Sequence, residues 1–172
     1  MTDVTTYYLQ MKSASLLHDK TDSKGLKVFE CKIKQFQFNR FLYQLVGNDW
    51  EWVDKNAWTD AQWREYAEND NLRTWVGYHR GSPAGYYELQ QQSDGNVEIA
   101  YLGLASKFIG RGFGGYLLSQ AIKSAWGWQG TRRVWVHTCT LDHPSALPNY
   151  KARGLMVYKV ETEQKGNKTP PP

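Results

Sequence analysis

The feature that most constrains this chain of 172 residues is a strand-like stretch that ends in a glycine-dense turn and continues directly into a helix pattern. Residues 99–104 form an apolar run of strand length, and apolar residues recur at helical spacing from Phe113 to Ala125. Between them lie four glycines, Gly110, Gly112, Gly114 and Gly115. Glycines let a backbone approach a ligand closely, and the first turn of a helix leaves its N–H groups unpaired. The stretch therefore predicts a backbone cradle for an anion.

Residues 110–115 also fit the G-x-G-x-x-G pattern of dinucleotide-binding folds. In those folds the glycines follow their strand almost directly, and an acidic residue closes the next strand about 20 residues on. Here residues 105–109 separate the strand from the glycines. The next apolar stretch, residues 133–140, contains no carboxylate, and the first one after it is Asp142. The spacing argues against a nucleotide-dependent oxidoreductase.

Two motifs in the second half resemble the signatures of the GNAT superfamily of N-acyltransferases. The first family signature is Q/R-x-x-G-x-G/A, and Gly112 and Gly114 occupy its small-residue positions, whereas Ile109 stands at the Q/R position. The second is N-x-x-A-x-x-x-Y-x-x-x-G-F. Its matching positions here are Ala146, Tyr150 and Gly154, while His143 replaces Asn and Leu155 replaces Phe. Two signatures in the family's order are much more specific than either one alone.

The resemblance implies a fold class and an acyl donor. GNAT proteins have a mixed α/β (α+β) fold, in which helices flank a central, twisted and mostly antiparallel sheet. Their fourth and fifth strands splay apart, and the pantetheine arm of acetyl-CoA runs between them. By resemblance, the backbone of Leu102, Gly103 and Leu104 pairs with this arm, and one of these N–H groups polarises the thioester carbonyl. The pyrophosphate is expected on the backbone of Ile109, Gly110, Arg111, Gly112, Phe113, Gly114 and Gly115.

The resemblance also suggests catalytic roles. Tyr150 is the predicted acid for the leaving thiolate, because a phenol can supply a proton without being ionised at neutral pH. Glu98 is the predicted base, because it lies on the strand where several GNAT enzymes carry a glutamate. The alternation of side chains along a strand predicts that Glu98 is on the opposite face of the sheet from Ile99 and Tyr101. Glu88 and His137 are the alternative bases. His143 stands where the family's Asn hydrogen-bonds near the cofactor, and an imidazole N–H could substitute for that amide.

Periodicity and turn residues predict a single domain over residues 1–163. Strands are expected at 5–12, 73–80, 84–91, 97–104, 133–140 and 155–162, and residues 26–36 read as a strand or the lead into a helix. One helix is expected at 38–46. A second begins at Thr59, which can form a capping box with Gln62, and a third surrounds Tyr150, with Ser145 as its N-cap. Residues 164–172 read as a disordered tail.

The composition indicates which classes of binding partner suit the chain. The formal net charge of +4 is mild and no Lys/Arg cluster stands out, so anionic small molecules are favoured over nucleic acid. The two cysteines, Cys31 and Cys139, are too few for a disulfide framework and show no metal-ligand spacing. There is no signal peptide or long apolar span, so the expectation is a cytoplasmic protein without a membrane partner. A homodimer is compatible with the sequence.

The sequence therefore predicts an N-acetyltransferase that moves an acetyl group from acetyl-CoA to a small-molecule or peptide amine by direct attack in a ternary complex. The close alternative is a non-catalytic acyl-CoA-binding sensor that lacks a working base, and a third is a protein-binding module with an aromatic groove. The 8 tryptophans, four of them at positions 50–63, form either a wall for a cationic or apolar acceptor or ordinary core packing. The acceptor itself is left open.

Overall fold

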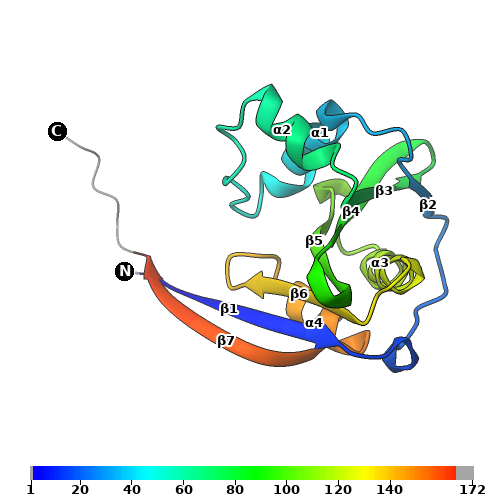
Figure 1. Ribbon diagram of the computed structural model, residues 1–172, viewed down its shortest axis with the longest axis vertical. Helices are drawn as coiled ribbons and strands as arrows, with labels where there is room; N and C mark the ends of the chain where they lie inside the picture. The colour runs from blue at the N-terminus through cyan, green and yellow to red at the C-terminus, as the bar shows by residue number, and fades with distance from the viewer. Residues whose placement is uncertain (1, 166–172) are drawn as a thin grey trace.

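The computed structural model describes residues 2–165, which form one seven-stranded sheet with helices on both faces (Figure 1). The strands lie in the order β2-β3-β4-β5-β6-β1-β7. In chain order the elements are β1 (Thr2–Met11), β2 (Lys27–Glu30), α1 (Phe36–Gly47), α2 (Asp60–Ala67), β3 (Leu72–His79), β4 (Ser82–Gln91), β5 (Asn96–Leu104), α3 (Gly114–Gly127), β6 (Arg133–Cys139), α4 (Ala146–Ala152) and β7 (Met156–Lys165). The predicted mixed α/β class with a mostly antiparallel sheet is confirmed.

The centre of the sheet is the predicted meander of β3, β4 and β5, joined by tight turns. Arg80 and Gly81 both have positive φ, 51° and 88°, which is the geometry that a two-residue hairpin needs. The second turn is one residue longer, Ser93–Gly95, and in it Asp94 and Gly95 have positive φ of 60° and 74°. Turn chemistry therefore fixes the register of the strands that carry the candidate site.

The strands β5 and β6 separate soon after they meet, as the resemblance implied. They pair in parallel only from Asn96 to Glu98 on β5 and from Arg133 to Trp135 on β6. Beyond these residues both strands continue without pairing to each other, and Figure 1 shows them running apart. The splay leaves one backbone edge of β5 facing a gap.

The two faces of the sheet bury separate cores. On one face α3 packs Leu117, Leu118 and Ile122 against strand residues such as Leu89 and Ile99, all at most 2% exposed. On the other face α1 and α2 cover an aromatic core, whose buried members include Phe36, Tyr43, Trp63 and Tyr86. The predicted capping box at the start of α2 is present, because Thr59 accepts from the Gln62 N–H and Gln62 accepts from the Thr59 N–H.

Three features differ from the sequence expectation or go beyond it. β1 lies between β6 and β7, so the first and last strands of the described chain are neighbours. Residues 26–36 contain both predicted alternatives, since β2 ends at Glu30 and α1 begins at Phe36. β7 includes Gln164 and Lys165, which the sequence pattern places in the tail, because they pair with Asp3 and Thr2 of β1. The rest of the predicted tail lies outside the described residues.

Candidate active site

A β-bulge in β5 places Glu98 on the same face of the sheet as Glu88. Tyr101 pairs with Glu88 and Ile99 pairs with Leu89, so Ala100 is an extra residue in β5. The bulge shifts the alternation of side chains by one residue. Glu98 therefore lies on the same face as Tyr101 and opposite Ile99, and the simple parity that set it opposite both residues was wrong. This is the face that α1 and α2 cover.

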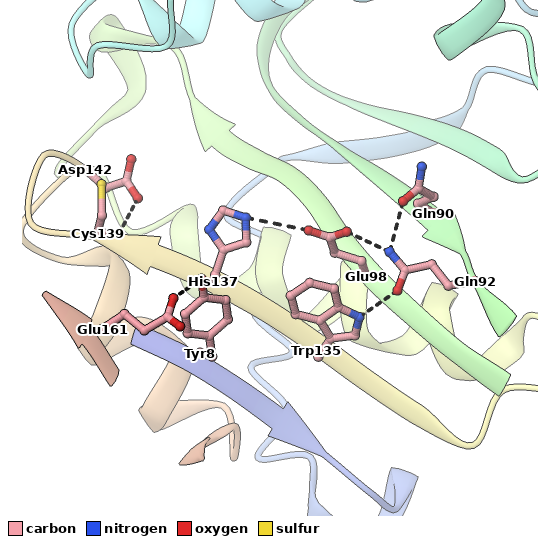
Figure 2. Close-up of polar contacts among 9 residues, drawn as sticks. All are labelled: Tyr8, Gln90, Gln92, Glu98, Trp135, His137, Cys139, Asp142 and Glu161. Carbon is pink, nitrogen blue, oxygen red and sulfur yellow. Dashed lines mark hydrogen bonds and ion pairs between the residues drawn. The ribbon is translucent and has the colours of Figure 1, made fainter. Parts of the chain in front are cut away.

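Glu98 sits at the point where β5 and β6 separate, held by contacts on both oxygens (Figure 2). Its Oε2 accepts a hydrogen bond from Gln92 Nε2 at 2.8 Å, and its Oε1 lies 3.7 Å from His137 Nε2. Gln92 is fixed in turn by the indole N–H of Trp135, which donates to Gln92 Oε1 at 3.0 Å. The structure thus brings together two of the three predicted bases, Glu98 and His137, on facing strands.

Burial and nearby charges shift the pKa of the Glu98 carboxyl in opposite directions. Its side chain is 14% exposed, whereas that of His137 is 50% exposed. Burial raises the pKa of the Glu98 carboxyl, while the charge of His137, the Gln92 hydrogen bond and the charge of Lys55 lower it. The pKa is raised on balance, which brings the carboxyl closer to the range of a useful general base. The half-exposed imidazole connects this carboxyl to solvent.

The third predicted base, Glu88, is locked inside the protein. It is 1% exposed, and it accepts hydrogen bonds from Asn39 Nδ2 at 2.9 Å and from the Tyr66 hydroxyl at 2.6 Å. Burial raises its pKa, and the Asn39 and Tyr66 hydrogen bonds and the charge of Lys55 oppose that rise. Both oxygens are used by protein donors, so Glu88 is placed to organise the face of the sheet rather than to receive a proton from a substrate.

The edge of β5 presents free backbone groups to the gap. The Ala105 N–H donates to the Ala84 carbonyl, toward β4, at 2.8 Å. Peptide groups alternate in direction along a strand, so those of Leu102 and Leu104 point into the gap, whereas those of Gly103 point toward β4. Gly103 instead makes room on the helical face, because a Cβ there would lie 2.5 Å from Val46 Cγ1. Of the three predicted backbone partners, two face the gap.

The glycine turn has the open conformation that an anion cradle needs. Gly110 and Gly112 have φ of 76° and 84°, a region that favours glycine. Helix α3 begins at Gly114 after Phe113, whose side chain cannot cap it, so the first N–H groups of the helix are free to bind a ligand. Ile109 and Arg111 lie in the same turn, and the Arg111 guanidinium lies over the rings of Phe108 and Phe113 at 5.5 and 5.6 Å.

Three cations that the sequence reasoning missed surround this cradle. A Cβ on Gly112 would lie 2.9 Å from Lys24 Nζ, and one on Gly115 would lie 2.6 Å from Lys20 Cδ and 3.2 Å from Arg153 Nη1. The Nε of Arg153 is buried and has no hydrogen-bond partner among residues 2–165. Lys20 and Lys24 come from the polar loop before β2, which carries no motif. Arg153 was visible beside Gly154 in the second signature.

Tyr150 and His143 fix the helix α4 beside the cradle. Tyr150 is 6% exposed in the α3 core, and burial raises the pKa of its phenol well above the ordinary value. His143 Nδ1 accepts the Ser145 N–H at 2.9 Å, so the imidazole holds the chain that leads into α4. Its ring also contacts Trp50 at 4.9 Å between centroids. A contact from the α1–α2 loop thus reaches across to the end of the chain that carries the second signature.

This arrangement has a free strand edge on β5, with a partly buried carboxylate at one end of it and a glycine cradle with cations after the other. The sequence over residues 39–155, more than half of the chain, matches the acetyltransferase (GNAT) family. The chain belongs to this family. Membership supports acyl transfer in general, and GNAT family members generally use acetyl-CoA. No curated protein matches the chain.

Solved structures of GNAT proteins share the fold at low sequence identity. A GCN5-related N-acetyltransferase from Kribbella flavida has a TM-score of 0.67 and 14% identity, over 92% of this GNAT chain and 56% of the other. One from Sphaerobacter thermophilus has a TM-score of 0.68 and 14% identity, over 93% and 51%. This chain therefore spans about half the length of these two proteins.

A smaller neighbour matches over most of its own length. It is an aminoglycoside acetyltransferase from an uncultured soil metagenomic sample, in complex with trehalose, with a TM-score of 0.62 and 16% identity, over 76% of this chain and 88% of that one. In the described part of this GNAT protein, the helices are too short or too polar to cross a bilayer.

Proposed function

We propose that the protein transfers an acetyl group from acetyl-CoA to a primary amine by direct attack in a ternary complex. The observation that carries this proposal is the position of Glu98, a partly buried carboxylate at the narrow end of the β5–β6 gap. The cradle at residues 110–115 follows the opposite end of β5. A donor whose pyrophosphate lies in the cradle and whose arm follows β5 would present its thioester toward Glu98.

The residues around the cradle suit the charge of this donor. Lys20, Lys24 and Arg153 add positive charge to the free N–H groups of α3, which suits phosphate groups. The gap-facing N–H groups of Leu102 and Leu104 would pair with the amide groups of the arm, and one of them would stabilise the oxyanion. When bound, acetyl-CoA supplies the activated acyl group.

In the reaction, Glu98 takes the proton that the attacking amine loses, and His137 passes it to solvent. The new C–N bond forms as the thioester C–S bond breaks, so the acyl group moves to nitrogen. The sulfur leaves as a thiolate, and Tyr150 is the candidate donor of its proton. Burial raises the pKa of this phenol, which keeps Tyr150 protonated at neutral pH but also makes it a weaker acid, so it can donate only as negative charge develops on the sulfur. A cytoplasmic location, where acyl-CoA is available, belongs to this proposal.

The alternative function is an acyl-CoA sensor without turnover. It shares the gap and the cradle, and differs in giving Glu98 and His137 no chemical role. The partly buried, hydrogen-bonded carboxylate next to a solvent-exposed imidazole favours the enzyme, because a sensor has no need for a proton route at this point.

Ligand-induced thermal stabilisation tests the donor, and an amine panel then tests turnover. Acetyl-CoA and CoA should raise the melting temperature, while NAD should not. Lys20→Gln and Arg153→Gln together should reduce the rise, and Lys27→Gln, an exposed residue on β2, is the matched control. Release of free CoA in the presence of a primary amine would establish the enzyme. Stabilisation by CoA without turnover on any amine would favour the sensor.

A further inference from the structure

The loop between α1 and α2 places a lysine ammonium inside a ring of aromatic side chains. Lys55 Nζ lies 4.0 Å from the ring centroid of Trp58, 4.7 Å from that of Tyr66 and 5.3 Å from that of Tyr101. These are distances at which the face of an aromatic ring attracts a cation. The backbone N–H of Lys55 donates to the Tyr43 hydroxyl at 3.3 Å, which anchors the base of the side chain. We call the three rings, Trp58, Tyr66 and Tyr101, the ammonium cage.

The electrostatic surroundings of the ammonium cage suit a cation. The carboxylates of Glu88, Asp54 and Glu98 all attract the Lys55 charge and raise its pKa, while burial, the larger effect, lowers it. Within residues 2–165, Lys55 forms no ion pair with a carboxylate at 4.0 Å or less. The ammonium is therefore held by ring faces and by the field of nearby carboxylates, without a direct carboxylate contact that would fix it in place.

The cage lies where the proposed reaction needs its acceptor. Tyr101 is the neighbour of Leu102, whose peptide groups face the gap, and it shares its face of the sheet with Glu98. An ammonium group in the cage is thus on the same face of the sheet as the predicted base, whose charge acts on it, and it contacts Tyr101, the residue next to the gap-facing Leu102. The amine nitrogen of an acceptor has to occupy this region for Glu98 to receive its proton.

Two rings of the cage also border a surface pocket. Trp58 and Tyr66 line a pocket of about 340 Å³ together with polar residues that include Gln62, Glu65, Asn69 and Gln90. Gln90 pairs with Glu98 across the β4–β5 ladder. A molecule in the pocket would therefore contact two of the three rings that surround Lys55. Amide groups and one carboxylate along it suit a polar, cationic molecule.

We propose that the ammonium cage is the binding subsite for the ammonium group of the acceptor, and that Lys55 occupies it as an internal ligand that the acceptor displaces. This inference rests on the proposed function and adds a substrate class to it. The acceptor carries a primary ammonium group on an unbranched aliphatic arm, because that is the shape of the side chain that fills the cage. Displacement needs only the Lys55 side chain to swing out, while the loop stays anchored through Trp52, whose ring packs against Tyr101 at 5.0 Å.

Binding of n-butylammonium in the absence of any acyl donor tests this directly. The signal is the indole N–H resonance of Trp58 in the ¹⁵N-labelled protein, assigned by comparison with Trp58→Phe. Lys55→Met keeps the length of the side chain and removes its charge, and Lys55→Gln is a second variant in case the first does not fold. If Lys55 fills the cage in more than about nine tenths of the molecules, either variant should bind n-butylammonium at least about tenfold more tightly than the wild type.

The controls separate charge from general access. Neutral 1-butanol should bind equally weakly to all variants, and Lys27→Met should bind n-butylammonium like the wild type. Trp58→Ala in the Lys55→Met background should abolish the gain. Unchanged or weaker n-butylammonium binding in both Lys55 variants would overturn the inference, because Lys55 would then be a structural part of the fold.

The test is independent of turnover. If Lys55→Met gains affinity for n-butylammonium while no amine is ever acetylated, the ammonium subsite stands and the proposed enzyme function falls. If amines are acetylated while the Lys55 variants bind n-butylammonium no better, the enzyme stands and this subsite falls.

Discussion

Replacing Glu98 with glutamine tests the assigned base with little change in shape. The amide oxygen of the new side chain can still accept from Gln92, so the local hydrogen bond at 2.8 Å is kept. What is lost is the negative charge and the ability to take a proton. General base catalysis contributes about 10²- to 10⁴-fold to rate, or about 2.7–5.4 kcal/mol of barrier, and kcat should fall by that factor.

The pH dependence gives a second, sharper readout from the same site. Glu98 is active as the carboxylate, so kcat/KM of the wild type should rise with pH through its raised pKa, and this limb should disappear in Glu98→Gln. His137 lowers the pKa of Glu98, so His137→Gln should move the limb to higher pH. The pair is 3.7 Å apart with a half-exposed imidazole. Such pairs are worth about 0.2–1 kcal/mol, so the limb should move by less than about one pH unit.

The assay is steady-state release of free CoA at saturating acetyl-CoA, with the primary amine varied from below to above its KM so that kcat and kcat/KM are both obtained, over a pH range that spans the raised titration of Glu98. Thermal stabilisation by CoA should be equal in the wild type and Glu98→Gln, which shows that the variant is folded and binds donor. The reasoning is refuted if Glu98→Gln keeps kcat within about threefold of the wild type, since that is far below a base contribution. The reasoning is also contradicted if Glu98→Gln loses rate but its kcat/KM still rises with pH over the same range as in the wild type.

Three further changes test the surroundings of the site. Burial raises the pKa of Glu88, so its contribution to stability is present at low pH and is lost as pH rises through the folded pKa. Glu88→Gln should remove this loss, which is worth about 1.4 kcal/mol for each pH unit that separates the folded pKa from the unfolded one, and urea unfolding at pH 4 and 7 measures it. Gly103→Ala should cost about 1–3 kcal/mol, because its Cβ would lie 2.5 Å from Val46 Cγ1, whereas Gly127→Ala meets nothing within 4 Å and should not destabilise. Tyr150→Phe should lower kcat about tenfold or more, because the proton donor is lost, without weakening CoA binding. If the variant turns over as fast as the wild type, Tyr150 is only a packing residue.

Much of the fold could be predicted because its signals are local. The strand at residues 84–91, the glycine turn before α3 and the capping box of Thr59 each depend on residues a few positions apart, and the structure confirms them. The family resemblance is confirmed by the match to the GNAT family over residues 39–155. The parity of Glu98 failed for an equally physical reason. A bulge at Ala100 depends on how β5 pairs with β4, and no pattern within β5 alone reveals it.

The sequence by itself determined the strand, glycine turn and helix of the cradle, because glycine conformation and helix periodicity are properties of consecutive residues. It also named Glu98 and His137. Only the tertiary structure decided that these two meet at 3.7 Å, that Lys20 and Arg153 converge on Gly115, and that Lys55 enters an aromatic cage. Those contacts join residues far apart in the chain. They depend on the sheet order and on the packing of loops, which follow from the burial of the whole core and not from any local pattern.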